Sequence, residues 1–262
     1  MTEIVLPGGT KPASQGTLVE QARAVAEVAA AVRVALDFPR DESKAADRMT
    51  ALCGRLSVAQ RAFYEVPNRG AGMSIHIARE LARIWGTVDY GVRELRRDDV
   101  EGVSEMQVWA WDQEQNVRTT RSFIQPHQRM KGGKRQALTD LGDIYLANQN
   151  TGARAVRECI FAMLPGWFVS EAEEILRGTL EHGEGQPIEE RATAAVGAFG
   201  KLGITQKMLE SRIGSVLTKW SPADVADLSR VYASITQDGI PAADFFPEQP
   251  VTIPAEITET GR

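Results

Sequence analysis

Basic side chains that could neutralise the phosphates of a nucleic acid are concentrated in one part of this 262-residue chain. Positions 115–157 carry eight Lys or Arg residues, whereas Asp140 and Asp143 are the only acidic ones there. The eight candidates for phosphate contact are Arg118, Arg121, Arg129, Lys131, Lys134, Arg135, Arg154 and Arg157. Because the Debye length is about 8 Å at physiological salt, a local basic surface attracts phosphate despite distant acidic segments. The net charge of −5 therefore excludes no acidic partner.

Three aromatic residues in the same region, Trp109, Trp111 and Phe123, are candidates for stacking on bases. Such stacking contributes about 1–3 kcal/mol per base. A small sheet also needs large residues on its buried face, which favours a core role and leaves both roles open. Arg118 and Arg121 lie on one predicted strand and, because their separation is odd, point to opposite faces. At most one of them shares a face with the two indoles.

No constellation for covalent catalysis stands out. Residues 132–134 (GGK) superficially resemble a phosphate-binding loop, but the first glycine and the Ser/Thr of that motif are missing. Cys159 lies in an apolar helical run and is expected in the core, while His127 lies among basic residues. The three histidines are scattered, and the acidic residues fit turns and helix starts. We therefore expect no catalytic residue, no metal and no cofactor. We also expect that the protein is not an enzyme.

A change from helical to alternating periodicity predicts a small sheet in the middle of the chain. Apolar and polar residues alternate over 87–97, 104–111 and 117–128, as in half-buried strands. Five turn-prone residues separate the last two strands, which favours an antiparallel hairpin. The three strands should form an antiparallel meander, followed by a basic, glycine-containing loop over 129–135.

The rest of the chain has mainly helical patterns, with capping boxes at Thr17/Glu20 and Ser170/Glu173 and a loop over 67–72. The expected helices cover 18–37, 41–55, 58–64, 75–85, 139–149, 153–164, 170–181, 187–200, 205–213 and 221–236. The predicted class is α+β: a small antiparallel sheet of about three strands flanked by helices, with a C-terminal helical module.

A Gly-rich stretch at 182–185 marks the expected domain boundary. It separates a core over 17–182 from a small helical module over 186–240. Residues 1–16 are expected to form a flexible tail, and residues 241–262 a Pro-rich acidic tail.

Composition is that of a folded protein, with 43% hydrophobic and 25% charged residues. No window supplies the roughly 20 uncharged residues of a membrane span, and the N-terminus shows no secretory signal. The two cysteines form neither a disulfide framework nor a zinc site, which fits a reducing cytosol.

Several stretches together resemble a known family. They are HIARELARIWGTVDYGVREL, SEMQVWAWDQEQNVRTTRSFIQPH, a Lys/Gly loop, LTDLGDIYLANQNTGARAVRECIFAMLPG and EAEEILRGTL, followed by KLGITQKMLESRIG and WSPADVADLSRVYASITQDG. This order resembles the phage and prophage single-strand DNA annealing proteins of the broad RecT/Red-beta superfamily. The resemblance covers about residues 55–239 and rests on element order and scattered motif residues.

The resemblance implies ATP-independent binding of single-stranded DNA and annealing of complementary strands in phage homologous recombination, in the cytoplasm of a bacterial host. It implies rings or filaments, with the N-terminal helix as a subunit contact. It places Arg154 and Arg157 on the DNA backbone, and residues 129–135, Arg118 and Arg121 along the same groove. The implied partners are single-stranded DNA, the annealed duplex intermediate, further copies of the chain, and a host single-strand-binding protein or phage exonuclease on the C-terminal module. No membrane partner is implied. The weak basic character of residues 1–114 departs from the pattern and leaves the extent of the groove open.

Two other functions stay open at this point. An oligomeric scaffold could use the Ala-rich N-terminal helix and the acidic C-terminal module, with the basic segment merely solvated. A nuclease is disfavoured by the lack of clustered carboxylates.

Overall fold

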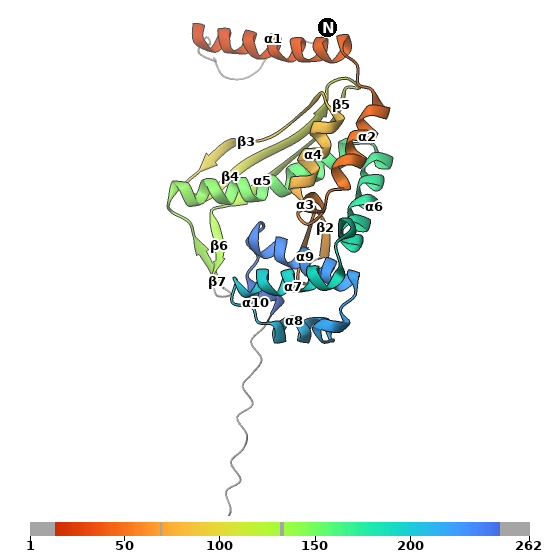
Figure 1. The fold of residues 1–262 in the computed structure, drawn as a ribbon. Coiled ribbons are helices and arrows are strands. Elements are labelled where there is room, and N and C mark those ends of the chain that lie inside the picture. The colour runs from red at the N-terminus through yellow and green to blue at the C-terminus, as the bar shows by residue number, and fades with distance from the viewer. Residues whose placement is uncertain (1–13, 69, 132–133, 247–262) are drawn as a thin grey trace, which may run out of the picture. The chain divides into compact units, whose positions relative to one another are not determined.

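The computed structural model describes residues 14–68, 70–131 and 134–246 (Figure 1). Their contacts divide the chain into two compact units, one of residues 1–46 and 81–165 and one of residues 47–80 and 166–262. The predicted α+β class is confirmed, since a three-stranded antiparallel sheet is flanked by helices and the C-terminal region is helical. None of the described helices has the length and apolar character that a membrane span requires.

The first unit is built on the predicted meander. Its strands are β3 (Val88–Asp98), β4 (Val103–Asp112) and β5 (Val117–Pro126), and β4 pairs antiparallel with both neighbours. The bounds agree with the alternating pattern to within about two residues. Asn116 closes the β4–β5 connection with a φ of 55°, in the left-handed region that asparagine tolerates.

One long helix, α5 (Leu141–Met163), packs across the meander, where the sequence predicts two helices over 139–149 and 153–164. The two-helix prediction is wrong because nothing between them breaks the helix. Gly152 is buried inside it, and a Cβ there would lie 2.7 Å from Cγ2 of Val92 on β3. This glycine therefore serves close packing of helix on sheet.

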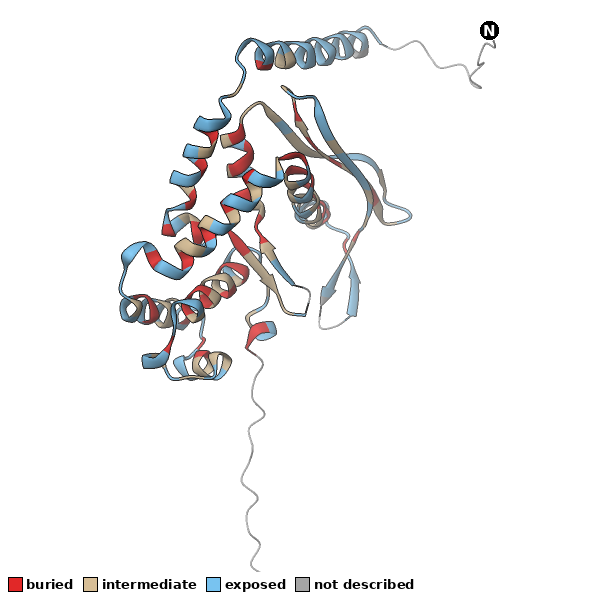
Figure 2. Cartoon of the chain, turned by 90° about the vertical axis from the view of Figure 1, so that its right-hand side faces the viewer, coloured by how far each residue is buried: buried red, intermediate tan, exposed pale blue. Residues whose placement is uncertain are grey.

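The helix α1 (Gln15–Asp37) begins at Gln15, earlier than the capping box predicts, so the last residues of the expected tail are helical. Figure 2 shows α1 exposed along nearly its whole length. A buried guanidinium anchors the segment that follows it: Arg40 Nη2 donates to Asp112 Oδ1 (2.5 Å) and Nε to Glu114 Oε2 (2.9 Å). Burial alone would raise the pKa of Glu114, but the bonds from Arg40 lower it by more.

The expected loop over 129–135 is instead a second small sheet, formed by β6 (Gln128–Lys131) and β7 (Lys134–Ala137). Backbone bonds fix its base, since the His127 amide donates to the Gly102 carbonyl (2.7 Å) and the Leu138 amide to the His127 carbonyl (2.8 Å). Residues 132 and 133 of the predicted loop lie outside the described residues.

In the second unit, two predictions about the stretch before residue 75 are wrong. The expected helix over 58–64 is a single turn, α3 (Leu56–Ala59), followed by β1 (Phe63–Val66). The expected loop over 67–72 contains β2 (Gly70–Met73), which pairs antiparallel with β1. Gly70 and Gly72 lie within β2 itself, and because glycine favours loops, the sequence pattern conceals this strand.

Two helices cross the division between the units, α2 (Glu42–Cys53) and α4 (Ile75–Trp85), and the bounds of α4 agree with the prediction. Ser74 is confirmed as the cap of α4, because its Oγ accepts from the Ile77 amide (3.4 Å).

The C-terminal helices follow the sequence closely. They are α7 (Ile188–Gly200), α8 (Gln206–Ile213) and α9 (Pro222–Thr236), the last with a capping box between Ser221 and Asp224. Short 3₁₀ turns, η1 (Gly183–Gly185) and η2 (Leu217–Lys219), connect them to the rest. The preceding helix α6 (Gly166–His182) starts before Ser170, so the capping box predicted there is wrong.

The start of the predicted acidic tail is ordered. Residues 242–245 form the short helix α10, and Phe245 and Phe246 are buried in the core of the second unit. The ring of Phe246 meets that of Phe199 edge to face at 5.7 Å. The remainder of the tail, 247–262, and residues 1–13 lie outside the described residues.

Two helical glycines with opposite surroundings test this packing. Gly152→Ala should destabilise the protein by about 1–3 kcal/mol, because the new methyl meets Val92. Gly197→Ala, at a site on α7 with nothing within 4 Å, should stabilise it by up to about 1 kcal/mol. Urea unfolding measures both, and equal effects at the two sites would contradict the close approach of α5.

Candidate nucleic-acid interface

The strand β4 separates the meander into a covered and an open face. Its even-numbered residues from Ser104 to Asp112 are buried and α5 packs against this strand, while its odd-numbered residues are only partly buried. On β5, the residues that pair with the odd-numbered positions are exposed, and Ile124 is 59% exposed. The open face is therefore the one that carries Trp109 and Trp111.

Trp109 lies flat against the open face beside an arginine. It is paired with Gly91 on β3, where a Cβ would lie 2.6 Å from the indole, so glycine makes room for the ring. The Arg93 guanidinium lies over the indole at 4.5 Å, and the indole N–H donates to Asp89 Oδ2 (2.6 Å). Arg93 is not among the residues predicted from the sequence, because only the register of β3 on β4 brings it to this face.

Trp111 repeats this arrangement on the β5 side. It is paired with Arg118, whose guanidinium lies 5.9 Å from the ring centroid. Its indole N–H donates to Asn116 Oδ1 (3.1 Å). Both indoles thus lie on the open face, and Phe123, paired with Met106, lies on the covered face. The two tryptophans therefore lie on the face that α5 leaves uncovered, whereas Phe123 lies on the face that packs against α5.

Arg121 points to the other face, as its odd separation from Arg118 predicts. It is paired with Val108 and is exposed at the edge of the sheet. Its positive charge opposes the effect of burial, which raises the pKa of the Cys159 thiol. Arg118 and Arg121 thus extend from the two faces of β5, which is an edge strand of the meander.

The hairpin of β6 and β7 continues this basic edge. Arg129 pairs with Gln136, and Arg135 with Met130, so the two arginines lie on opposite faces of the hairpin. Lys134 and Arg135 are exposed, whereas Arg129 lies 3.5 Å from the carboxylate of Asp143. Lys131 is placed in β6 opposite Lys134, and its side chain lies outside the described part of the structure.

The two arginines on α5 differ from each other. Arg154 is exposed, whereas the Arg157 side chain is only 14% exposed and bonds Glu158 Oε1 at 2.9 Å. A shared helical face therefore does not make the pair equally available to a phosphate. The predicted residues that the structure describes do not all share one face: Arg118 is on the open face, Arg121 on the covered side, and Arg154 on the helix.

The edge strand and hairpin are distinguished by a lack of acidic residues. From Val117 to Ala137 the chain has six Lys or Arg residues and no Asp or Glu. Among the described residues, no carboxylate lies within ion-pair distance of four of these cations, Arg118, Arg121, Lys134 and Arg135. The open face is balanced in charge, since its three arginines Arg93, Arg96 and Arg118 accompany Asp89, Asp98 and Glu105. The excess of positive charge thus lies on the edge and hairpin, and the two indole–guanidinium pairs lie on the open face.

A buried polar cluster holds the base of the hairpin. Ser104 Oγ–H donates to Glu94 Oε1 (2.8 Å), and Oγ accepts from Asn148 Nδ2 (3.1 Å). Its remaining lone pair lies 2.8 Å from His127 Nε2, so this nitrogen carries the proton and donates. Hydrogen bonds from Arg97 lower the pKa of Glu94 and keep it an acceptor. This polarity is the reverse of a serine nucleophile activated by histidine.

Neither cysteine has the surroundings of a reactive thiol. Cys53 and Cys159 are both buried, and burial raises the pKa of Cys53 to about 12. The expectation that Cys159 is a core residue is confirmed. Within the described residues, no group of three or more His, Cys, Asp or Glu side chains is placed to hold a metal ion.

Comparison of the chain with protein-family models, with curated proteins and with solved structures gives no match. The resemblance to annealing proteins therefore rests on the quoted residues and stays a prediction.

The cluster around Ser104 can be tested by removing its shared oxygen. Ser104→Ala should lower the free energy of unfolding by about 2 kcal/mol or more, because His127 and Asn148 lose their buried acceptor. Ser122→Ala, at an exposed position of β5, should change it by less than about 0.5 kcal/mol. Thermal or urea unfolding gives the comparison, and equal losses would show that the cluster has no structural role.

Proposed function

We propose that this chain binds single-stranded DNA along β5 and the β6–β7 hairpin and anneals complementary strands without hydrolysing a nucleotide. The observation that carries the proposal is the acid-free basic run from Val117 to Ala137, which adjoins two indole–guanidinium pairs on the open face. Unpaired cations attract phosphates, and indole or guanidinium planes accept stacked bases. Neither feature requires covalent chemistry.

The edge position of β5 suits an extended polynucleotide. At about 3.3 Å per residue, its ten residues offer a straight path of roughly 33 Å. Arg118 and Arg121 reach out from both sides of this path, and Lys134 and Arg135 extend it beyond His127. A strand held by its phosphates keeps its base edges available to a second strand. Duplex formation then supplies the free energy of annealing, about 1.4 kcal/mol per base-pair step.

Self-association is part of the proposal, and α1 is its surface. Leu18, Val25 and Val28 are each more than half exposed on this helix, and Val25 is 71% exposed. A row of exposed apolar residues of this kind marks an interface more often than a solvated surface. Association of copies through α1 would align several basic edges along one strand. The same surface would serve a scaffold, which binds no nucleic acid.

The decisive experiment mixes the purified chain with two complementary oligonucleotides in the absence of ATP. We expect the two oligonucleotides to pair faster with the protein than without it. We also expect light scattering to detect particles larger than one chain. Large particles with no gain in pairing rate and no strand binding would favour the scaffold. Magnesium-dependent cleavage of the strands would favour a nuclease.

Single variants should separate the electrostatic and stacking contributions. Four engaged phosphates give a salt slope of about −3 on single strands, and Arg121→Ala should reduce it by about 0.7. Trp111→Leu should weaken binding by about 1–3 kcal/mol and leave the slope unchanged. Fluorescence anisotropy of a labelled oligonucleotide over a salt series measures both quantities.

Matched controls lie in the second unit. Arg177→Ala removes an arginine that is paired with Glu173, and Trp167→Leu removes an exposed indole. Both should bind as the wild type does. A slope near zero in the wild type, or equal losses in the controls, would refute the assigned surface.

A further inference from the structure

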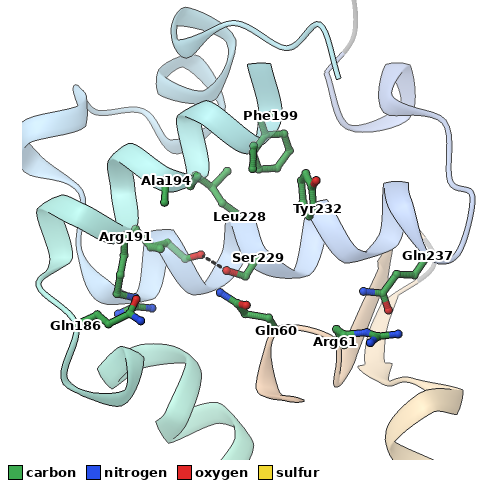
Figure 3. A pocket seen from close by; sticks show the side chains of 13 residues that line it. Gln60, Arg61, Gln186, Arg191, Ala194, Phe199, Leu228, Ser229, Tyr232 and Gln237 are labelled. Atoms are coloured by element: carbon green, nitrogen blue, oxygen red, sulfur yellow. Dashed lines mark hydrogen bonds between the residues drawn. The ribbon is translucent and has the colours of Figure 1, made fainter. Parts of the chain in front are cut away.

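The second unit contains a cavity of about 300 Å³ between α7 and α9 (Figure 3). Three alanines of α7, Ala194, Ala195 and Ala198, form one wall, and Phe199 and Leu228 contribute to the floor. Short methyl side chains leave a flat wall that a planar ring can approach. The volume is at the lower end of the range for small-molecule sites.

The mouth of this cavity carries polar side chains without partners. They are Gln60 and Arg61 beside α3, Gln186 before α7, and Tyr232 and Gln237 at the end of α9. Among the described residues, none of these five side chains makes a hydrogen bond or an ion pair. Figure 3 shows the Gln60 and Gln237 amides on the same side of the cavity as Arg61. An apolar floor with a few unpaired polar groups is the usual arrangement of a ligand site.

The electrostatics of the lining favour an anion. Arg191, whose exposed fraction is 8%, donates to the Leu180 and Glu181 carbonyls at the end of α6. Its charge meets carbonyl dipoles, and burial lowers its pKa. A Cβ on Gly183, at a φ of 64°, would collide with this guanidinium, so only glycine leaves room for the Arg191 side chain. Arg61 adds a second cation, and no Asp or Glu belongs to the lining.

We propose that this cavity binds a nucleotide, with its base against the alanine wall and its phosphate at Arg61. Side-chain amides of glutamine pair with the edges of nucleobases, above all adenine. A guanidinium binds phosphate through two parallel hydrogen bonds. An apolar peptide side chain would fit the floor but would leave three glutamine amides without partners. The inference does not depend on strand binding by the first unit.

The proposed nucleotide ligand could come from two sources, a free mononucleotide or the terminal nucleotide of a strand. Calorimetric titration of the full chain with AMP, adenosine and ribose 5-phosphate tests the first source. We expect AMP to bind at micromolar to millimolar concentrations, and each fragment at least about tenfold more weakly. Competition of AMP with short oligonucleotides, with and without a 5′-phosphate, tests the second. Displacement only by the phosphorylated strand would identify a strand end as the ligand.

Variants tie binding to the cavity. Arg61→Gln should weaken AMP binding about tenfold or more, through the loss of a charge-assisted contact. Ala195→Leu should fill the cavity and abolish binding, and Gln237→Leu should weaken binding without adding bulk to the helix contact. The control Arg177→Gln changes an arginine outside the lining and should bind as the wild type does.

The possible outcomes decide the matter in either direction. No AMP binding at millimolar concentration, equal binding of ribose 5-phosphate, or equal affinity in all variants would overturn the proposal. Tighter binding of an apolar peptide than of AMP would also overturn it. AMP binding that survives Arg118→Ala with Arg121→Ala, while strand binding is lost, would separate this site from the proposed annealing surface.

Discussion

The close packing of α5 on one face of the meander determines what the first unit can present to a ligand. Gly152 lets the helix axis approach β3, and every second residue of β4 is committed to that contact. A strand has a period of two, so the alternate residues must face away from the helix. The position of Trp109 and Trp111 on the open face is thus a direct consequence of burying Met106, Val108 and Ala110.

The cations of the chain divide according to what neutralises them. Arg40 and Arg212 are held by carboxylates, Arg191 is held by carbonyls, and all three act within the fold. Arg118, Arg121, Lys134 and Arg135 have no such partner among the described residues. Charged residues on an edge strand also prevent that strand from pairing with the sheets of other molecules. This role would explain charges on β5 without any ligand. Protection of the edge does not explain the complete absence of acidic residues over 21 positions or the proximity of the two indoles.

Local patterns predicted most of the fold, and non-local contacts account for the errors. The three strands of the meander and the helices α7, α8 and α9 were predictable because periodicity and caps are local signals. The hairpins β1–β2 and β6–β7 were missed because glycine and lysine also favour loops. The break predicted near residue 150 was wrong because Gly152 is fixed by Val92, which lies 60 positions earlier.

The candidate site shows the same limit. The opposite orientations of Arg118 and Arg121 follow from their spacing, whereas the face that carries the tryptophans depends on where α5 packs. Arg93 could be assigned only once the register of β3 was known. Pairing of Arg157 with Glu158 depends on rotamers that no sequence pattern contains.

The two units differ in how charge can act on a ligand. The second unit has eighteen acidic and thirteen basic residues, so a long polyanion would be repelled there. Screening over about 8 Å still allows the Arg61 guanidinium to attract one phosphate in a cavity whose lining contains no Asp or Glu. The first unit has a different arrangement, an extended edge that carries no acidic residue from Val117 to Ala137. An extended strand therefore suits the edge of β5, and a single compact anion suits the space between α7 and α9.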